Sequence, residues 1–171
     1  MEKCALAIAL CLLAASTTPA QTKTVLEGVW TIAEVVLPDT SPFGKPGVPR
    51  TNSNPQPSLI IFSQRYYSRL NIEGRAPRLP VARPRDPRNP TDEEKIGLYE
   101  HWRPFTATAG TYEISGSTLI LDSLVAKNVA VMERSTPSKW EIKLEGRNTL
   151  WLIPSPDRAA AEPRMKLVRL E

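Results

Sequence analysis

The chain has 171 residues, a formal net charge of +4 at pH 7, one histidine and two cysteines. This length suits one ordinary domain with a proper core. Because both cysteines, Cys4 and Cys11, lie near the N-terminus and His101 stands alone, the composition excludes disulfides, a cysteine nucleophile and the usual zinc ligand sets in the remainder of the chain. We therefore expect neither a metal nor another cofactor.

Residues 1–20 have the pattern of a secretion signal. A lysine precedes an apolar run of 12 residues from Cys4 to Ala15, and small and polar residues follow up to Ala20. A membrane-spanning helix needs about 20 apolar residues, so a cleaved signal is favoured over an uncleaved anchor. We expect a cut near Ala20, a secreted or periplasmic protein without a membrane span, and one domain over residues 21–171.

Strand-forming residues run from Val25 to Leu37, and Pro38 ends this first predicted strand. Prolines and glycines then predict a surface loop over residues 38–57. Residues 58–74 read as two strands of a hairpin that turns at Ser63 and Gln64.

Residues 74–90, "GRAPRLPVARPRDPRNP", combine five arginines with regularly spaced prolines. Such spacing keeps a segment extended and poor at packing. A solvated loop is the simplest interpretation, although arginines can meet nucleic acid, an anionic surface or a carboxylate. The functional interpretation that we prefer is a lid over the open end of a barrel, and we expect no nucleic-acid partner.

A helix of about three turns is expected after Pro90. Thr91 followed by Glu94 is a capping box, in which each side chain satisfies the backbone amide of the other residue. The helix carries an apolar stripe and ends at Pro104; the stripe consists of Ile96, Leu98, Tyr99 and Trp102.

Strands are expected from Phe105 to the C-terminus. In the segment after Lys139, apolar and charged residues alternate with the period of a sheet that has one wet face. A tight turn at residues 145–148 then leads into the next strand. The expected strands cover residues 105–116, 117–124, 127–136, 139–145, 150–153 and 164–171.

This pattern gives about eight or nine short strands and one short helix. Short turns between consecutive strands require antiparallel pairing, and closing such a sheet removes its exposed edges. The expected fold is therefore all-β, an antiparallel up-and-down β-barrel, with a β-sandwich as the alternative. A closed barrel of eight strands can be filled by side chains or can hold one small ligand.

Gly28 and Trp30 form a Gly-x-Trp pattern on the first expected strand. This pattern resembles the signature of the lipocalins and related calycins. The resemblance implies that Trp30 closes the barrel floor beside Gly28, and that an arginine near the end of the last strand covers its ring. Arg169 is at the matching position, and Arg164 is a second candidate.

The order of further blocks is similar to that of a bacterial and fungal lipocalin-like group. A Leu-Ile-Ile-Phe strand at residues 59–62 is followed by Arg-Tyr-Tyr-Ser at 65–68, the helix, and Ala-Gly-Thr-Tyr-Glu at 109–113. The likeness spans nearly the whole chain after the signal. The likeness implies a lipocalin-like barrel more than it implies any activity.

Glu34 is a candidate site residue within the first strand. Strict alternation puts it on the same face as Trp30, so that its carboxylate points into the lumen if Trp30 does. An unpaired buried carboxylate costs several kcal/mol, so we expect a partner such as Arg69 or a tyrosine. A paired structural carboxylate, or one near a wet rim, is the simpler interpretation, and anchoring a ligand or handling a proton is the functional one.

Aromatic side chains with polar tips make up the other candidates for a binding pocket. With Glu34 and Arg69, the expected ligand-binding residues are Tyr66, Tyr67, Tyr112, Trp140 and Trp151. Aromatic residues in strands can equally be plain core.

These residues favour a secreted barrel that binds a small, largely apolar molecule, hydrophobic or amphipathic, without chemistry. One alternative is a cyclase or isomerase that uses Glu34, His101 or a tyrosine as acid or base. Another is a structural envelope protein that interacts through its arginine-rich loop. His101 stands at a helix end, where a simple favourable charge explains it, so no catalytic residue is assigned.

Overall fold

The structure, a computed structural model, describes residues 24–38, 50–160 and 162–171. The expected signal peptide at residues 1–20 lies outside the described residues, as does most of the loop expected at 38–57.

Within the described residues the chain forms one sheet of nine strands with two helices. In chain order the elements are β1 (Gly28–Leu37), β2 (Arg50–Asn52), β3 (Ser58–Ser63), β4 (Tyr66–Ile72), α1 (Asp92–Trp102), β5 (Phe105–Ser115), β6 (Thr118–Ala126), α2 (Val129–Met132), β7 (Ser138–Glu145), β8 (Thr149–Pro154) and β9 (Arg164–Arg169).

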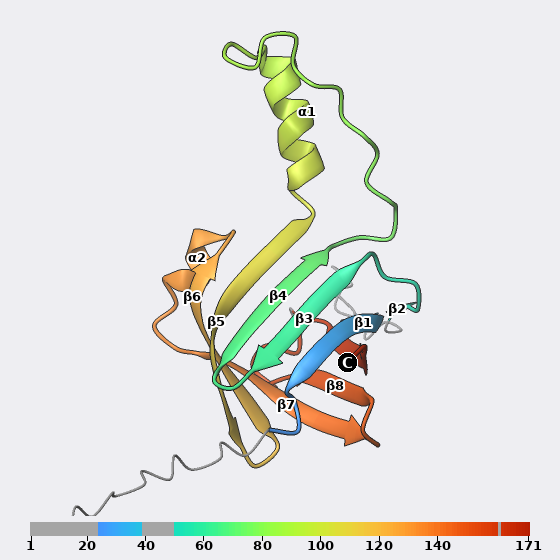
Figure 1. Ribbon diagram of the computed structural model, residues 1–171, viewed down its shortest axis with the longest axis vertical. Helices are drawn as coiled ribbons and strands as arrows, with labels where there is room; N and C mark the ends of the chain where they lie inside the picture. The colour runs from blue at the N-terminus through green and yellow to red at the C-terminus, as the bar shows by residue number, and fades with distance from the viewer. Residues whose placement is uncertain (1–23, 39–49, 161) are drawn as a thin grey trace, which may run out of the picture.

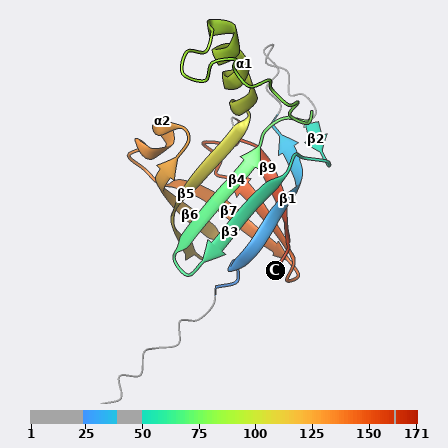
Figure 2. The ribbon, with the colours of Figure 1, turned by 45° about the horizontal axis from the view of Figure 1, so that its top comes forward.

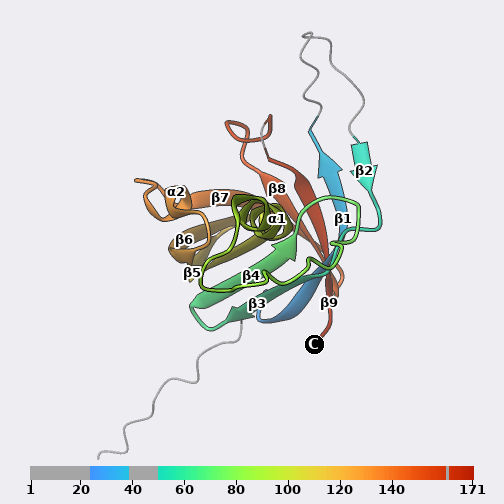
Figure 3. The same cartoon turned by 90° about the horizontal axis from the view of Figure 1, so that it is seen from above.

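The sheet is closed into a barrel. Each strand from β3 to β8 pairs antiparallel with the next one in the chain, and β1 pairs with both β3 and β9. Eight strands therefore form the ring, while β2 is a short extra strand on β1. Figure 3 shows the strands arranged around this ring. The pairing of β1 with β9 confirms the expected antiparallel barrel and excludes the sandwich, because a sandwich leaves the first and last strands as separate edges.

Inward-facing side chains fill the part of the barrel near the start of β1. Trp30 and Leu26 are fully buried there, and Phe62 packs edge-on against Tyr112 with ring centroids 5.1 Å apart. The remaining buried apolar residues are Ile32, Ile60, Tyr67, Leu119, Trp140, Leu150, Leu152, Met165 and Leu167.

A bulge in β1 changes which of its residues face inward. Ile32 pairs with Leu167 and Glu34 pairs with Lys166, so one residue of β1 between them has no partner on β9. An extra residue reverses the alternation of side chains. As a result Val35, and not Glu34, packs against the core. The expectation that Glu34 shares the inward face of Trp30 is therefore wrong.

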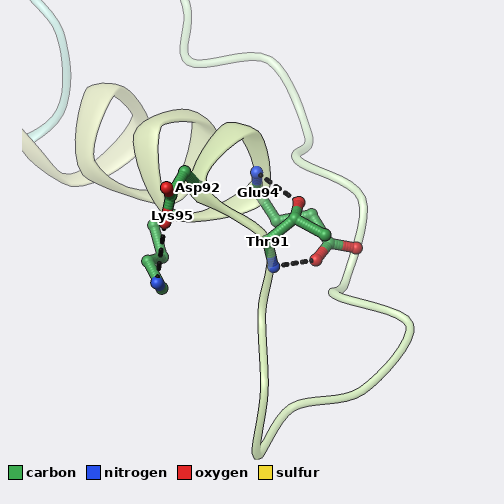
Figure 4. Close-up of polar contacts among 4 residues, drawn as sticks. All are labelled: Thr91, Asp92, Glu94 and Lys95. Atoms are coloured by element: carbon green, nitrogen blue, oxygen red, sulfur yellow. Dashed lines mark hydrogen bonds and ion pairs between the residues drawn. The ribbon is translucent and has the colours of Figure 1, made fainter.

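The capping box of α1 is present as expected. The hydroxyl of Thr91 accepts a hydrogen bond from the Glu94 amide at 3.3 Å, and the Thr91 amide donates to the Glu94 carboxylate at 2.8 Å. In the same turn, the ammonium group of Lys95 forms an ion pair with the Asp92 carboxylate at 2.9 Å (Figure 4). Because α1 buries no residue, its stability depends on such local contacts.

The apolar stripe of α1 is largely exposed, although Trp102 packs edge-on against Phe105 at the start of β5 with ring centroids 5.6 Å apart. Ile96, Tyr99 and Trp102 are 63%, 63% and 54% exposed. Figures 1 and 2 show that α1 lies beyond the end of β4 and the start of β5, on the side of the barrel away from the C-terminus. Its base is held by Lys127, whose ammonium group donates hydrogen bonds to the carbonyls of Trp102, Arg103 and Phe105. Cations are favourable at this end of a helix.

Two further expectations about secondary structure are wrong. The expected strand at residues 127–136 is instead the connection that contains α2, which Asn128 caps by accepting a hydrogen bond from the Ala130 amide at 3.1 Å. β6 pairs with β7 through residues 118–121 and 138–141, so the ladder does not use this segment. β2, in turn, lies within the expected loop and pairs with residues 35–37 of β1.

Candidate functional site

A cavity of about 520 Å³ lies at the end of the barrel next to α1 and α2. Its walls come from β4, β5, β6 and β7, from the two helices and from the loop after β8. The lining residues are Tyr67, Arg69, Asn71, Glu73, Tyr99, Arg103, Phe105, Thr106, Ala107, Thr108, Leu121, Asp122, Ser123, Lys127, Asn128, Val131, Met132, Arg134, Thr136, Pro137, Ser138, Trp140, Arg158 and Glu162.

Three alternating residues of β4 form one polar wall of the cavity. Tyr67, Arg69 and Asn71 point inward because successive side chains of a strand face opposite sides. The Tyr67 hydroxyl shares a hydrogen bond with the Ser123 hydroxyl at 2.8 Å, and Arg69 Nε donates to Asn71 Oδ1 at 3.0 Å. These two hydrogen bonds hold the side chains of the wall in position.

The guanidinium of Arg69 has no carboxylate partner at ion-pair distance among the described residues. Burial lowers the pKa of Arg69, and the more distant charges of Glu73 and Glu162 together with Tyr67 raise it in part. Its one hydrogen bond to a described residue uses Nε, so neither Nη group donates to the rest of the described protein. A charge held inside a protein is costly unless it is paired. Arg69 therefore presents its two Nη amino groups and a positive charge to the cavity.

A second polar group lies on the opposite wall, around Trp140. Arg158 lies over the Trp140 ring at 5.8 Å, donates to the Ser138 hydroxyl and forms an ion pair with Oε1 of Glu162. Trp140 Nε1 donates to the same Ser138 hydroxyl at 3.0 Å. The other oxygen of Glu162, Oε2, is buried without a hydrogen-bond partner in the described part of the chain.

The charges around the cavity do not balance. Among the lining residues that the structure describes, five are basic and three are carboxylates. Positive charge around a concave site raises the local concentration of anions. The lining of the cavity therefore carries an excess of positive charge.

The opposite end of the barrel is closed by Trp30 and Arg169. The guanidinium carbon of Arg169 lies 4.1 Å from the centroid of the Trp30 ring, and the Trp30 indole donates to the Leu26 carbonyl at 2.8 Å. Arg169 also donates to the carbonyls of Val25 and Arg147 at 2.8 and 3.0 Å. Eight antiparallel strands thus form a closed ring in chain order, and the contact between Trp30 and Arg169 joins the first strand to the last. The chain has a lipocalin-like fold.

Comparisons with known proteins add little to this assignment. No family model and no curated protein matches the sequence. Among solved structures, a lipocalin-like protein from Bacteroides uniformis is 10% identical over 86% of this chain and 100% of its own, with a TM-score of 0.46. An uncharacterized protein from Bacteroides eggerthii is 9% identical over 84% of this chain and 98% of its own, with a TM-score of 0.43. The lipocalin-like assignment rests on the strand order and closure described above.

Three of the expected ligand-binding residues, Tyr67, Arg69 and Trp140, line the cavity of the lipocalin-like barrel. Tyr112 also faces inward but lies in the closed end, where its hydroxyl shares a hydrogen bond with Thr24 at 2.8 Å. Burial raises the pKa of Tyr112. Tyr66 is 60% exposed, since its neighbour Tyr67 takes the inward position on β4.

Glu34 and Trp151 lie on the outside of the barrel. Both are paired with Lys166 of β9, on the face opposite to the core. The Trp151 ring is contacted by Arg164 at 5.4 Å and by Lys166 at 5.5 Å. Arg164 therefore covers Trp151, and Arg169 covers Trp30. The bulge in β1 explains the position of Glu34, and the alternation of side chains along β8 explains that of Trp151.

His101 is part of α1 and is not among the lining residues, although Tyr99 and Arg103 of the same helix are. The part of the chain that the structure describes has no group of three or more histidine, cysteine or acidic residues arranged to hold a metal ion. In the same ranges no helix is both long and apolar enough to cross a membrane.

The arginine-rich segment runs from the barrel to α1 without lining the cavity. Arg78 lies over the Phe105 ring at 6.0 Å, and the Arg85 amide donates to the Glu94 carboxylate at 3.0 Å. These contacts attach the segment to the start of β5 and to the first turn of α1. The conformation described here does not place it as a lid over the cavity.

Several residues that line the cavity were not among the expected site residues. Asn71 shares the period-two face of Tyr67 and Arg69, so alternation along β4 could have identified it. Arg158 and Glu162 are four residues apart, the spacing of an ion pair across one helical turn, and the Glu162 amide does donate to the Arg158 carbonyl at 2.9 Å. Nothing in the sequence indicates that this turn lies against Trp140.

Proposed function

We propose that this protein binds a small amphipathic molecule with an acidic group in the cavity of its lipocalin-like barrel. The single observation that carries the proposal is Arg69, whose guanidinium faces the cavity without a carboxylate partner among the described residues. The volume of about 520 Å³ falls within the range of small-molecule sites.

The role of Arg69 as an anchor follows from the energetics of buried charge. Its pKa is lowered by burial, so the surroundings penalise its charged form. A carboxylate on a ligand would remove this penalty and accept two parallel hydrogen bonds from a guanidinium, which is the strongest common geometry for this pair. Arg69 thereby destabilises the empty barrel and stabilises the occupied one.

The rest of the cavity suits an apolar chain or ring next to the acid. Phe105, Leu121, Val131, Met132 and Trp140 contribute apolar surface. Methionine adapts its shape to irregular neighbours, which favours contact with a flexible ligand. The ligand expected from the sequence was largely apolar, and the polar wall on β4 narrows the proposal to an amphipathic acid.

The proposal can be tested by comparing octanoate with 1-octanol, which differ only at the head group. We expect isothermal titration calorimetry to show octanoate binding at least about tenfold more tightly. Arg69→Gln should abolish this preference, because the neutral amide cannot replace the charge. Arg103→Gln is the matched control, since Arg103 also lines the cavity but is paired with Glu100 at 2.9 Å.

Thermal unfolding provides a second readout. Without a ligand, Arg69→Gln should be at least as stable as the wild type, because the substitution removes an uncompensated charge from the barrel interior. Octanoate should raise the Tm of the wild type and of Arg103→Gln, and leave that of Arg69→Gln unchanged. Equal binding of the acid and the alcohol by the wild type would overturn the proposal.

We also propose that the protein is exported, on the basis of the sequence pattern of residues 1–20. Intact-mass measurement of protein isolated from its host should show a chain that begins near Gln21. A mature protein that retains residues 1–20 would contradict export with cleavage.

A further inference from the structure

We propose that Asn71 is a second residue of the head-group site, in which its amide nitrogen donates a hydrogen bond to the acidic group that Arg69 binds. Its amide oxygen orients Arg69 without neutralising the guanidinium. This inference rests on the proposed function, since it concerns the same ligand in the same cavity. It specifies the protein atoms that recognise the acidic group.

The first observation is the burial of Asn71. Apart from aromatic side chains, Asn71 is the one polar residue of the described chain that is buried, with 6% exposed. Its neighbours in the two ladders are Ser58 of β3 and Thr106 of β5, and its carbonyl accepts a hydrogen bond from the Thr106 hydroxyl at 3.2 Å. The backbone of Asn71 is thus fixed on both sides, and its side chain faces the cavity.

The second observation is that only half of the Asn71 amide is bonded within the described protein. Arg69 Nε can only donate, so the atom that faces it at 3.0 Å must be Oδ1 of Asn71. Nδ2 makes no hydrogen bond to the described residues, and it is not among their side-chain atoms that lack both a partner and contact with solvent. Nδ2 is therefore a donor that a molecule in the cavity can reach.

The hydrogen bond to Asn71 also decides how Arg69 can bind an acid. Because Nε is engaged by Oδ1, the pair of donors that remains for a carboxylate is Nη1 and Nη2. Neither Nη atom has a partner among the described residues, and neither is cut off from solvent. Arg69 and Asn71 stand on the same face of β4, so their three nitrogen donors belong to one wall of the cavity.

Asparagine is better suited to this position than aspartate. A carboxylate at position 71 would accept from Nε and Nη2 of Arg69 and form a paired, electrically neutral group. The asparagine amide accepts from Nε and adds no charge. Arg69 is therefore held in one orientation while its positive charge stays available to the ligand.

Asn71→Asp tests this assignment with a change of one side-chain atom. An oxygen can still accept from Arg69, but the donor Nδ2 becomes part of a carboxylate. We expect isothermal titration calorimetry to show at least about tenfold weaker binding of octanoate and unchanged binding of 1-octanol. Without a ligand, the variant should have a Tm no lower than that of the wild type, because the new carboxylate pairs with Arg69. A damaged fold would not combine weaker binding of the acid with undiminished stability.

Asn128→Asp is the matched control, since it makes the same atomic change in another residue that lines the cavity. Oδ1 of Asn128 caps α2 by accepting from the Ala130 amide, and aspartate caps a helix as well as asparagine does. The Asn128 side chain has no hydrogen bond to Arg69. This control should keep the preference for octanoate over 1-octanol, so it separates the loss of the Asn71 donor from the mere addition of negative charge.

A measurement on the wild-type protein does not depend on any variant. In protein labelled with nitrogen-15, the side-chain amide protons of Asn71 should shift downfield as octanoate is added, because a carboxylate is a stronger acceptor than water. 1-Octanol should not produce this shift, and the side-chain amide of Asn128 should keep its position with both ligands. Resonances of Asn71 that stay in place at saturating octanoate would overturn the inference.

The outcomes also distinguish this inference from the proposed function. If binding of octanoate depends on Arg69 but is unchanged in Asn71→Asp, the assignment of Asn71 is wrong and the proposed function stands. An equal loss in Asn71→Asp and Asn128→Asp overturns the assignment as well. If wild-type protein does not prefer octanoate to 1-octanol, both proposals fail. If Asn71→Asp does not fold, the side-chain resonances of the wild type decide.

Discussion

Arg169 lies over the Trp30 ring with its guanidinium carbon 4.1 Å from the ring centroid, and so connects the last strand of the barrel to the first. The same guanidinium donates to carbonyls of residues that precede β1 and follow β7, namely Val25 and Arg147. A cation over an indole contributes about 0.5 to 2 kcal/mol. The backbone hydrogen bonds add to this, and together they fix the closed end of the barrel.

Arg169→Met should destabilise the protein by about 2 to 4 kcal/mol, because it removes both the contact with the buried Trp30 ring and the hydrogen bonds to backbone carbonyls before β1 and after β7. Arg164→Met is the matched control, since Arg164 covers Trp151 on the outer surface and donates no comparable set of hydrogen bonds among the described residues. Its cost should not exceed about 1 kcal/mol. Urea unfolding would measure the free energy of unfolding of both variants, and an equal loss in the two would refute this role of Arg169.

Gly110 should not tolerate a side chain. A Cβ atom at this position would lie 1.9 Å from the Asp122 carbonyl oxygen, where β6 has a bulge opposite β5. Because the obstacle is backbone, we expect Gly110→Ala to lower the free energy of unfolding by about 3 kcal/mol. Gly97→Ala is the control: its Cβ meets nothing within 4 Å, and alanine favours the exposed helix α1. Chemical denaturation should show a loss of stability for the first variant only.

Fluorescence can locate the bound ligand, because Trp140 lines the cavity and Trp151 lies outside it. Binding of octanoate should change the emission of the wild-type protein through Trp140, whose surroundings lose water. Trp140→Phe should remove most of this change, and Trp151→Phe should preserve it. A response that vanishes with Trp151 instead would show that the acid binds to the outer surface.

The helix α1 should lose its structure in acid. Hydrogen bonds from the amides of Thr91 and Arg85 lower the pKa of Glu94 below its ordinary value. Since the folded pKa is depressed, this capping contribution is complete above the ordinary pKa and is lost as the pH falls through the lower folded value. Carbon chemical shifts of α1 should therefore become less helical as the pH falls from about 5 to about 3.

Two substitutions test this explanation of the acid response. Glu94→Gln should reduce the pH dependence of α1, because an amide accepts the same hydrogen bonds without titrating. Glu93→Gln should retain it, since the Glu93 carboxylate takes no part in the capping box. If both variants respond to acid as the wild type does, the capping box is not the cause. The barrel should show no change in either variant, since α1 buries no residue against it.

Local signals in the sequence were sufficient for most of the elements. Thr91 and Glu94 are three residues apart, and a capping box depends on nothing outside those residues. Gly146, with a φ of 67°, forms the turn between β7 and β8 because the left-handed region favours glycine. Short turns in series also require antiparallel neighbours, so the up-and-down order of the barrel followed from the sequence.

The binding residues were harder to predict, because the side that a residue faces depends on its partner strand. Alternation placed Glu34 inside, but the bulge arises from the pairing of β1 with β9, more than a hundred residues away in the chain. Trp151 lies outside because its neighbours Leu150 and Leu152 take the buried positions of β8. Tyr67 and Arg69 line the cavity because β4 has a regular ladder with both neighbours, which keeps its alternate side chains inward.

The sequence by itself therefore determined the antiparallel order of the barrel strands and the helix cap, since these depend on local periodicity and on short connections, while the residues of the barrel floor were expected from the resemblance to lipocalins. Only the tertiary structure decided that Arg69 faces a cavity without a carboxylate partner at ion-pair distance among the described residues. The physical reason is that charge pairing inside a barrel depends on distances between strands and loops that no local pattern encodes.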